Sequence, residues 1–339
     1  MSGSDLMAFD SDNSVNKNLS SDEVREDLEC LKILFKNFYI AQMIYPKINL
    51  ISRVDQEISR SRPTNSQNLM RRIFSLHRDM YDIHLSYELN WLPLKFETSS
   101  KKEVKLSEDL NHDEIYDRSN YLYFRPSSLI HFTAGQKRFI ETVSNVDKNI
   151  IIDIRGNGGG DDAFAFALTE AVFTKDQKIP ATTKLQVASL FQSIGFSLSL
   201  IMHEYDVAES FRKTIAEQVE KLSLQELLPF QIQSETQKLI GKRSTPLKSK
   251  IILITDGACA SSCETIVEKL SAHPNVQIMG TNTAGALHFS NAITFMLPHS
   301  GIVVKMPTLL HQYENDAPEG IGYKPDIEAL NIDLNSIFK

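Results

Sequence analysis

A serine stands where a buried strand would turn into a helix, in the stretch ITDGACASSCETIVEKL at residues 254–270. Ser261 precedes Glu264 by three positions, and this S-x-x-E spacing is typical of a helix capping box. The same corner could instead present a nucleophilic hydroxyl beside backbone N–H groups that stabilise developing negative charge. The residues just before it, including Gly257 and Ala258, are small enough to let a substrate approach. Residue types and spacing alone therefore leave Ser261 as either a cap or a nucleophile.

A second stretch with the residue types of a binding site is IIIDIRGNGGGDD at residues 150–162, a buried strand followed by a glycine-rich turn that opens a helix. Glycines permit positive φ and let backbone N–H groups face a ligand, and the start of a helix adds positive potential. This combination suits an anion, either a phosphate or an oxyanion. A dinucleotide fingerprint is excluded because Asp161 stands at the third glycine position, and a P-loop is excluded because no G-K-[ST] follows.

The elements that would carry these two stretches alternate between strand and helix. From residue 120 onward, short apolar strands such as NIIIDI and KIILITD are each followed by a segment with helical periodicity. Residues 20–92 are mostly helical in pattern, and Ser20 with Glu23 predicts the cap of the first helix. This order of elements predicts an α/β fold with helices in front of it.

The composition excludes several classes of function. The net charge is −7 and no basic block stands out, so nucleic acid is not an expected partner. No run of about 18 apolar residues predicts a membrane span, and the first twenty residues lack the pattern of a signal peptide. The three cysteines, Cys30, Cys259 and Cys263, are too few and odd in number for a disulfide framework, and no histidine pair accompanies them as in a zinc site. We expect no metal and no organic cofactor.

Four motifs occur in order along the chain: NIIIDIRGNGGG, ILITDGACASSCETI, VQIMGTNTAG and EGIGYKPDI. Together they resemble the C-terminal processing (tail-specific) serine protease family, whose members show a strand ending in D-[LIV]-R-x-N-x-G-G, then S-x-x-E, then G-x-x-T-x-G, and a late glycine-containing element ending in P-D. The resemblance covers about residues 120–330. It implies an α/β fold in which a crotonase-like protease core of mixed strands and helices follows an N-terminal helical subdomain.

The chain departs from this family at one catalytic position. Bacterial members pair the serine with a lysine, whose matching position here is Ala286, and no lysine stands between Lys269 and Lys305. A Ser–Lys dyad is therefore excluded on this alignment. In lacking that lysine the chain is similar to the tricorn protease core and to the chlamydial secreted protease, which use a serine, a histidine and a late glutamate.

This resemblance implies three catalytic residues. Ser261 would be the nucleophile, and His84, in the D-x-H pattern of MYDIHLSYELN, would be the general base. Glu319, directly before the last motif's glycines, would orient His84 and stabilise its charged form. Because the three residues are far apart in sequence, only the fold could unite them.

The oxyanion hole implied by the resemblance combines the two opening stretches. The backbone N–H of Ser262 and those of the turn at Gly158 and Gly159 would hold the developing negative charge. Ser262 is also the main rival nucleophile, because a shift of one residue in the alignment exchanges it with Ser261.

The domain organisation follows from composition and from where the motifs begin. The parts are a flexible tail at 1–19, an N-terminal helical subdomain at 20–95, a linker at 96–119, and the protease core at 120–339 with a helical insertion at about 205–240. The helical subdomain would carry His84. The interval between His84 and the first core strand is too short for the PDZ domain that members of the family often carry.

These features favour a serine endopeptidase that cleaves a peptide or protein substrate through an acyl-enzyme. One alternative is a non-catalytic ligand- or peptide-binding relative, because retinoid-binding proteins of the eye use the same fold, and a weaker one is an esterase-like hydrolase. A degenerate binder has no reason to keep both His84 and Glu319 in register with Ser261. The family resemblance suggests an exported or periplasmic location, although the chain shows no signal peptide, and the sequence indicates no oligomeric state.

Overall fold

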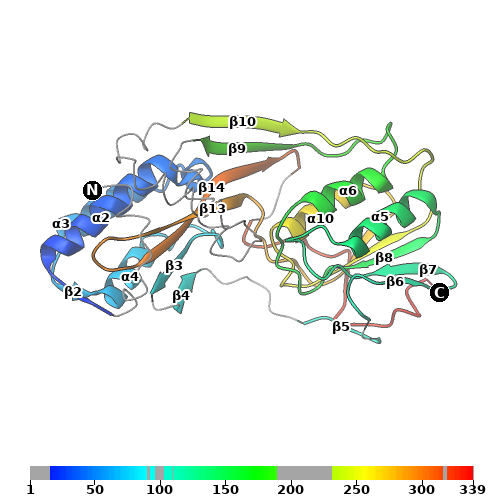
Figure 1. The fold of residues 1–339 in the computed structure, drawn as a ribbon, viewed down its shortest axis with the longest axis horizontal. Coiled ribbons are helices and arrows are strands. Elements are labelled where there is room, and N and C mark those ends of the chain that lie inside the picture. The colour runs from blue at the N-terminus through cyan, green and yellow to red at the C-terminus, as the bar shows by residue number, and fades with distance from the viewer. Residues whose placement is uncertain are drawn as a thin grey trace. The chain divides into compact units, whose positions relative to one another are not determined.

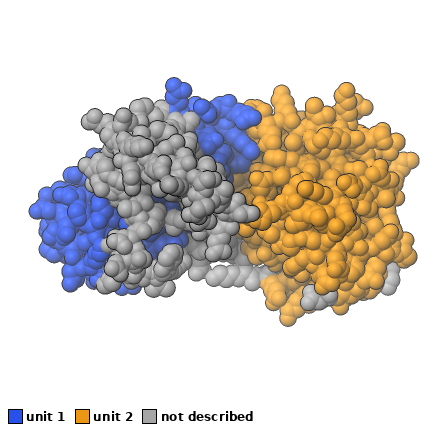
Figure 2. Space-filling view, viewed as in Figure 1, with its two compact units in different colours: residues 1–97, 184–235, 289–311 blue, residues 98–183, 236–288, 312–339 orange. Residues whose placement is uncertain are grey.

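The computed structural model divides the chain into two compact units. The described residues are 16–89, 92–95, 103–108, 110–188, 231–315 and 319–338, with only the backbone described at 92–95 and at 188. Unit 1 comprises residues 1–97, 184–235 and 289–311, and unit 2 comprises residues 98–183, 236–288 and 312–339 (Figure 2). Each unit is therefore assembled from three separate stretches of chain.

Unit 2 has the α/β organisation that the sequence predicts. Its six-stranded sheet has the order β15-β12-β11-β8-β7-β6, and all neighbours are parallel except β6, which is antiparallel to β7. The strands are β6 (Ile115–Asp117), β7 (Tyr121–Phe124), β8 (Asn149–Asp153), β11 (Ile251–Thr255), β12 (Val276–Gly280) and β15 (Ile327–Glu328). A separate parallel pair is formed by β5 (Lys105–Leu106) and β16 (Asn331–Ile332).

Both faces of this sheet are buried, because side chains alternate along its central strands. Ile150 and Ile152 of β8 pack into one apolar cluster with Leu253, whereas Ile151 packs into another with Ile252. The first cluster includes residues of three helices that lie side by side along the sheet in Figure 1: α5 (Ala134–Asn145), α6 (Ala163–Val172) and α10 (Ser262–Leu270). Strands covered on both faces read as continuous apolar runs, which is why β8 and β11 were recognisable.

Unit 1 packs helices against a second sheet. The helices are α2 (Ser21–Phe38), the 3-10 helix η2 (Ile40–Met43), α3 (Leu50–Ser59) and α4 (Ser66–Ser75). The sheet order is β10-β9-β14-β3-β4, and β13 also pairs with β14. The strands are β3 (Ser86–Leu89), β4 (Leu92–Lys95), β9 (Thr182–Ala188), β10 (Gln231–Gln237), β13 (Phe289–Met296) and β14 (Val303–Tyr313), with β1 (Asn18–Leu19) and β2 (Thr64–Asn65) as a small antiparallel pair.

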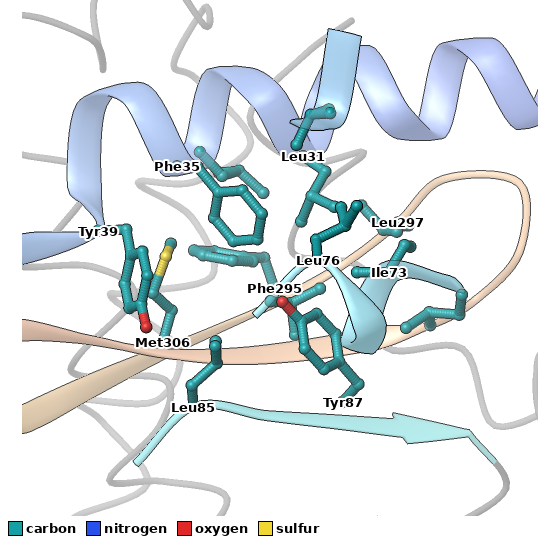
Figure 3. Close-up of a cluster of buried hydrophobic side chains, with 14 of the residues drawn as sticks. Leu31, Phe35, Tyr39, Ile73, Leu76, Leu85, Tyr87, Phe295, Leu297 and Met306 are labelled. Carbon is teal, nitrogen blue, oxygen red and sulfur yellow. The ribbon is translucent and has the colours of Figure 1, made fainter. Parts of the chain in front are cut away.

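The core of unit 1 joins helices from the start of the chain to strands from its end. Phe35 of α2, Ile73 of α4, Tyr87 of β3 and Phe295 of β13 are fully buried in one cluster, which Figure 3 shows in close-up. Burial of each such side chain stabilises the fold by about 1.5–3 kcal/mol. The capping box predicted for the first helix is confirmed, since the N–H of Ser20 donates to Glu23 Oε2 at 2.7 Å and the N–H of Glu23 donates to Ser20 Oγ at 3.3 Å.

Three predicted segments differ from the structure. The predicted tail ends in strand β1, the predicted linker contains strands β5 and β6, and part of the predicted helical insertion is a strand. Residues 231–237, inside the insertion predicted to be helical, form strand β10, whose side chains are almost all exposed. Its pairing with β9 is a tertiary interaction, which overrides the local helical pattern. The remaining residues of that predicted insertion, up to 230, lie outside the described residues. Within the described part, no helix is long and apolar enough to cross a membrane.

Candidate active site

Ser261 occupies a sharp corner between β11 and α10 in unit 2. It is the N-cap residue of α10 and has φ 55° and ψ −123°. Among the described non-glycine residues, only Asp113, Ser261 and Asn291 have positive φ. Such a conformation costs about 1–3 kcal/mol for an L-residue and persists only where the surrounding structure fixes it. A strained strand-to-helix corner is the local geometry that exposes a nucleophilic serine in many hydrolases.

The corner has the hydrogen bonds of a helix cap, and they bear on how far the Ser261 hydroxyl is engaged. The reciprocal contacts of a capping box are present between Ser261 and Glu264. The N–H of Ser261 donates to Glu264 Oε2 at 3.2 Å. The N–H of Glu264, however, makes its short hydrogen bond of 2.7 Å to the carbonyl oxygen of Ser261 and not to its hydroxyl. The Ser261 hydroxyl makes no N-cap hydrogen bond of normal geometry. The main chain therefore carries the cap, and the hydroxyl is not committed to it.

The glycine turn after β8 lies directly against Ser261. A Cβ added to Gly159, which has φ +94°, would come within 2.9 Å of both Ser261 Cβ and Ser262 N, so only glycine fits there. The turn is held by Asn157, whose Oδ1 accepts from the N–H of Gly159 at 3.0 Å and whose carbonyl oxygen accepts from the N–H of Ala260 at 3.1 Å. The glycine turn after β8 and the serine corner before α10 are thus in direct contact.

Asp256, directly after β11, ties the same two stretches together. Its Oδ1 accepts from the N–H of Gly156 and from the N–H of Ala258, each at 3.0 Å. One carboxylate oxygen thereby fixes the start of the glycine turn and the start of the serine corner. Sequence reasoning overlooked this residue, although an aspartate directly after a buried strand was visible.

Glu264 connects the serine corner to the turn that follows β12. Its carboxylate is fully buried and accepts hydrogen bonds from the N–H of Gly285 at 2.8 Å, the N–H of Ala286 at 2.7 Å and the hydroxyl of Thr283, in addition to the N–H of Ser261. Burial raises the pKa of this carboxyl, while these donors act to lower it. The glutamate of S-x-x-E is therefore the anchor of both turns.

Glu319 holds the next two residues of that same turn. Its Oε2 accepts from the N–H of Leu287 at 2.9 Å and from the N–H of His288 at 2.8 Å, and the N–H of Gly320 donates to the carbonyl oxygen of Gly285 at 2.8 Å. Consecutive amides from 285 to 288 are thus shared between two carboxylates. Ser261 and Glu319 are brought into one hydrogen-bonded assembly in unit 2, with Glu264 between them.

The rival nucleophile Ser262 has its hydroxyl engaged. Ser262 Oγ donates to the carbonyl oxygen of Gly160 at 3.0 Å, and the side chain is almost fully buried. Its backbone N–H stands in the first turn of α10, where helix geometry leaves amides without an intrahelical partner. This residue suits the oxyanion role predicted for its amide better than a nucleophilic role for its hydroxyl.

His84 belongs to unit 1 and is described within that unit. It stands in the turn before β3, where Asp82 Oδ1 accepts from the N–H of His84 at 2.9 Å and from the N–H of Leu85 at 3.2 Å. Asp82 Oδ2 accepts from the hydroxyl of Tyr39 at 3.0 Å, and Figure 3 shows Tyr39 and Leu85 within the core of the unit. The aspartate of D-x-H therefore fixes the backbone that carries the histidine.

The His84 ring is in the protonation state that a general base needs. Burial lowers its pKa to about 4, so the imidazole is neutral at pH 7. Part of the residue remains exposed, but Nδ1 is covered and has no hydrogen-bond partner among the described residues. His77, in contrast, is fully buried with Nε2 2.6 Å from the Tyr87 hydroxyl, and burial lowers its pKa to about 3, so it is part of the core.

Comparison with known proteins identifies the family. The family model for peptidase family S41 matches residues 122–329, more than half of the chain. The chain belongs to this family. No curated protein matches the chain.

Among solved structures, a protein from Parabacteroides merdae ATCC 43184 with a provisional assignment as a peptidase has a TM-score of 0.57 at 14% identity over 91% of this chain and 90% of that one. The photosystem II D1 C-terminal processing protease has a TM-score of 0.35 at 17% identity, over 63% of this chain and 42% of that one. Mature CPAF complexed with lactacystin has a TM-score of 0.41 at 15% identity, over 61% of this chain and 47% of that one. The first likeness shows a shared fold, and the chain spans less than half the length of the other two proteins.

The S41 match covers all of the site residues of unit 2 described above. One feature of this site contradicts the sequence prediction. Cys259 and Cys263 form a disulfide that spans Ser261, with Cα atoms 5.4 Å apart. The odd cysteine count argued against a disulfide framework, but one local pair needs no framework. Cys30 is buried and takes no part in a disulfide. The four-residue spacing across a helix start was the overlooked signal. In the described part of the chain, no three His, Cys, Asp or Glu side chains gather as metal ligands would.

Proposed function

We propose that this member of family S41 is a serine endopeptidase in which Ser261 is the nucleophile, His84 the general base and Glu319 the carboxylate that orients His84. The observation that supports it most is the conformation of Ser261, a serine with positive φ held against Gly159 at the start of a helix. Neither strain nor close approach is needed for a serine that merely caps a helix, because caps ordinarily lie in the β region.

In this mechanism the Ser261 hydroxyl attacks the carbonyl carbon of the scissile peptide while His84 accepts its proton. The tetrahedral oxyanion is stabilised by the N–H of Ser262 and by one N–H of the adjacent glycine turn, that of Gly158. In the present conformation the N–H of Gly159 donates to Asn157 Oδ1, so Gly159 contributes mainly the space beside the serine. His84 then returns its proton to the leaving amine, and water hydrolyses the acyl-enzyme.

The role given to Glu319 follows from what His84 requires. A neutral imidazole accepts a proton at one nitrogen only if the other carries a hydrogen, and that N–H needs an acceptor when it is buried. Nδ1 of His84 is buried without such an acceptor in the described part of the chain. A carboxylate at this nitrogen would set the tautomer and stabilise the imidazolium formed during attack.

Labelling with a fluorophosphonate probe, followed by mass spectrometry of the adduct, tests this proposal. We expect one adduct on Ser261, no adduct in Ser261→Ala, and labelling slowed by about 10²–10⁴-fold in His84→Ala. Ser271→Ala, at the other end of α10, is the matched control and should label like the wild-type chain. Absence of labelling in folded wild-type protein would favour the non-catalytic relative, and an adduct on Ser262 would show that the register of the nucleophile is wrong.

Cleavage of peptides distinguishes an endopeptidase from an esterase of the same triad. The wild-type chain should cut an unstructured protein such as reduced, alkylated casein at internal bonds, and Ser261→Ala should not. Hydrolysis of p-nitrophenyl esters without any cut in the protein substrate would overturn the peptidase assignment while leaving the triad intact.

A further inference from the structure

The disulfide between Cys259 and Cys263 encloses the corner that carries Ser261. The two cysteines stand two residues before and two residues after the serine, and both are fully buried. Between them the chain changes from the turn after β11 to the first turn of α10, with Ser261 at φ 55°. The covalent link therefore joins the two sides of the one strained residue in the site.

Each cysteine is also hydrogen-bonded to a part of the site other than the serine. The carbonyl oxygen of Cys259 accepts from the N–H of Ala284 at 2.9 Å, which belongs to the turn that Glu264 and Glu319 hold. The N–H of Cys263 donates to the carbonyl oxygen of Ala260 at 3.1 Å. The disulfide thus links the turn after β12 to the first turn of α10, on both sides of the nucleophile.

From this geometry we propose that the Cys259–Cys263 disulfide is a positioning element for Ser261, so that the oxidised chain is the catalytically competent form. The proposal rests on the assignment of Ser261 as nucleophile. A loop closed by a covalent bond between residues four apart in sequence has few conformations, and the one with positive φ at Ser261 is selected by the packing of Gly159. A misplacement of the nucleophile by about 1 Å can slow an enzyme by roughly 10²-fold.

The reduced state of the Cys259–Cys263 pair is reached by thiol–disulfide exchange. A dithiol such as dithiothreitol attacks one sulfur as its thiolate, breaks the S–S bond through a mixed disulfide, and closes to its own cyclic disulfide, leaving two protein thiols. Cys263 Sγ lies 3.4 Å from the carbonyl oxygen of Ile154, so its thiol has an acceptor at hand in the reduced form. Because both sulfurs are buried, we expect this reduction to be slow in the folded chain and to need local opening of the corner.

The experiment compares the fluorophosphonate labelling of Ser261 in oxidised wild-type protein, in protein reduced by dithiothreitol, and in Cys259→Ala/Cys263→Ala. We expect the maximal labelling rate to fall by roughly 10- to 100-fold in the reduced protein and in the double variant, with little change in the probe concentration that gives half-maximal rate. Treatment with oxidised glutathione should restore the rate in the reduced wild-type protein and not in the double variant. Cys30→Ala is the matched control, because Cys30 is buried but belongs to no disulfide, and it should label like the wild type in both redox states.

Hydrogen–deuterium exchange of the peptide covering residues 256–270 gives a readout that does not depend on activity. The amides of Cys263, Glu264 and Thr265 donate within the corner, so they should exchange faster in the reduced protein than in the oxidised one. Equal labelling rates in the double variant and the wild type, with equal exchange in this peptide, would overturn the proposal. If oxidised wild-type protein shows no labelling, the nucleophile assignment fails, and the exchange difference alone then decides whether the disulfide fixes the corner.

Discussion

The backbone at Ser261 has a conformation that only its surroundings can maintain. The backbone of Gly159 packs directly against it, Glu264 accepts from its N–H, and the disulfide between Cys259 and Cys263 closes the loop around it. The backbone of Ser261 is therefore strained, although a serine that only caps a helix needs no strained conformation. Strain at a single residue of this kind has consequences that can be measured without any substrate.

We predict that Ser261→Gly is more stable than Ser261→Ala by about 1 kcal/mol, since glycine adopts φ 55° without the steric cost of a Cβ. The free energy of unfolding in guanidinium chloride measures this difference. The same pair of substitutions at Ser271, which has φ −60°, should give the opposite order, with alanine more stable. Equal stabilities of the two Ser261 variants would mean that the corner carries no strain.

A second residue-scale prediction concerns the pH at which the base becomes protonated. Burial lowers the pKa of His84 to about 4, so the ring stays neutral well below its ordinary value of 6.5. The acid limb of the labelling rate of Ser261 against pH should therefore have its midpoint below 6.5. Glu319→Gln removes the carboxylate that would favour the imidazolium and should move the midpoint lower still. A wild-type midpoint at or above 6.5 would contradict the environment described for His84.

At the scale of elements, patterns local to the chain predicted most of the strands and helices that carry the site in unit 2 and the first helix of unit 1. The apolar runs of β8 and β11, the capping box of α2 and the corner before α10 were all visible, because each depends on residues within one turn or one strand. Strand β10 was not visible, since its sequence QIQSETQ has no apolar face and its pairing with β9 defines it. The disulfide was missed for a different reason, because a count of cysteines says nothing about a local pair.

The anchoring role of Glu264 gives a prediction at this scale, because it joins α10 to the turn after β12. Glu264→Gln keeps the size of the side chain but replaces a carboxylate oxygen by an NH₂ group that faces backbone donors. We expect a loss of about 1–3 kcal/mol in stability and at least a tenfold slower labelling of Ser261. Differential scanning calorimetry and the fluorophosphonate probe measure the two effects. Glu170→Gln, on α6 and ion-paired to Lys242, is the control and should change neither by as much.

At the scale of the whole molecule, the sequence could not reveal how the chain is divided. The core of unit 1 combines helices before residue 76 with strands after residue 288, and such pairings leave no trace in local periodicity. For the same reason the predicted triad stays a prediction: Ser261 and Glu319 share one hydrogen-bonded assembly in unit 2, while His84 is fixed by Asp82 within unit 1. The D-x-H pattern was read for its histidine, although its aspartate has the clearest structural role.

The buried ionisable groups of unit 1 make its stability depend on pH, and the histidines and the aspartate act in opposite directions. The pKa of His77 is lowered to about 3 and that of His84 to about 4, so each adds stability that is full above pH 6.5 and is lost as the pH falls toward those values. Burial raises the pKa of Asp82 to about 7, so its contribution is full below pH 3.8 and is lost as the pH rises through 7. Between pH 4 and 6.5 the two histidines outweigh the aspartate, and stability should rise with pH.

Asp82→Asn removes the one contribution of these three that decreases as the pH rises and leaves those of the two histidines. In this variant the free energy of unfolding should therefore rise more steeply with pH than in the wild type. The difference in slope between pH 4 and 6.5 should approach about 1.4 kcal/mol per pH unit, the value for one proton. Guanidinium unfolding at several pH values measures both slopes, and the variant's uniform loss of stability from the vacated hydrogen bonds does not affect the comparison. Asp55→Asn is the control, because Asp55 forms an exposed ion pair with Lys32 and should leave the slope unchanged. Parallel curves for wild type and Asp82→Asn would show that Asp82 is ionised in the folded chain, and that the backbone under His84 is held by a carboxylate rather than by a carboxylic acid.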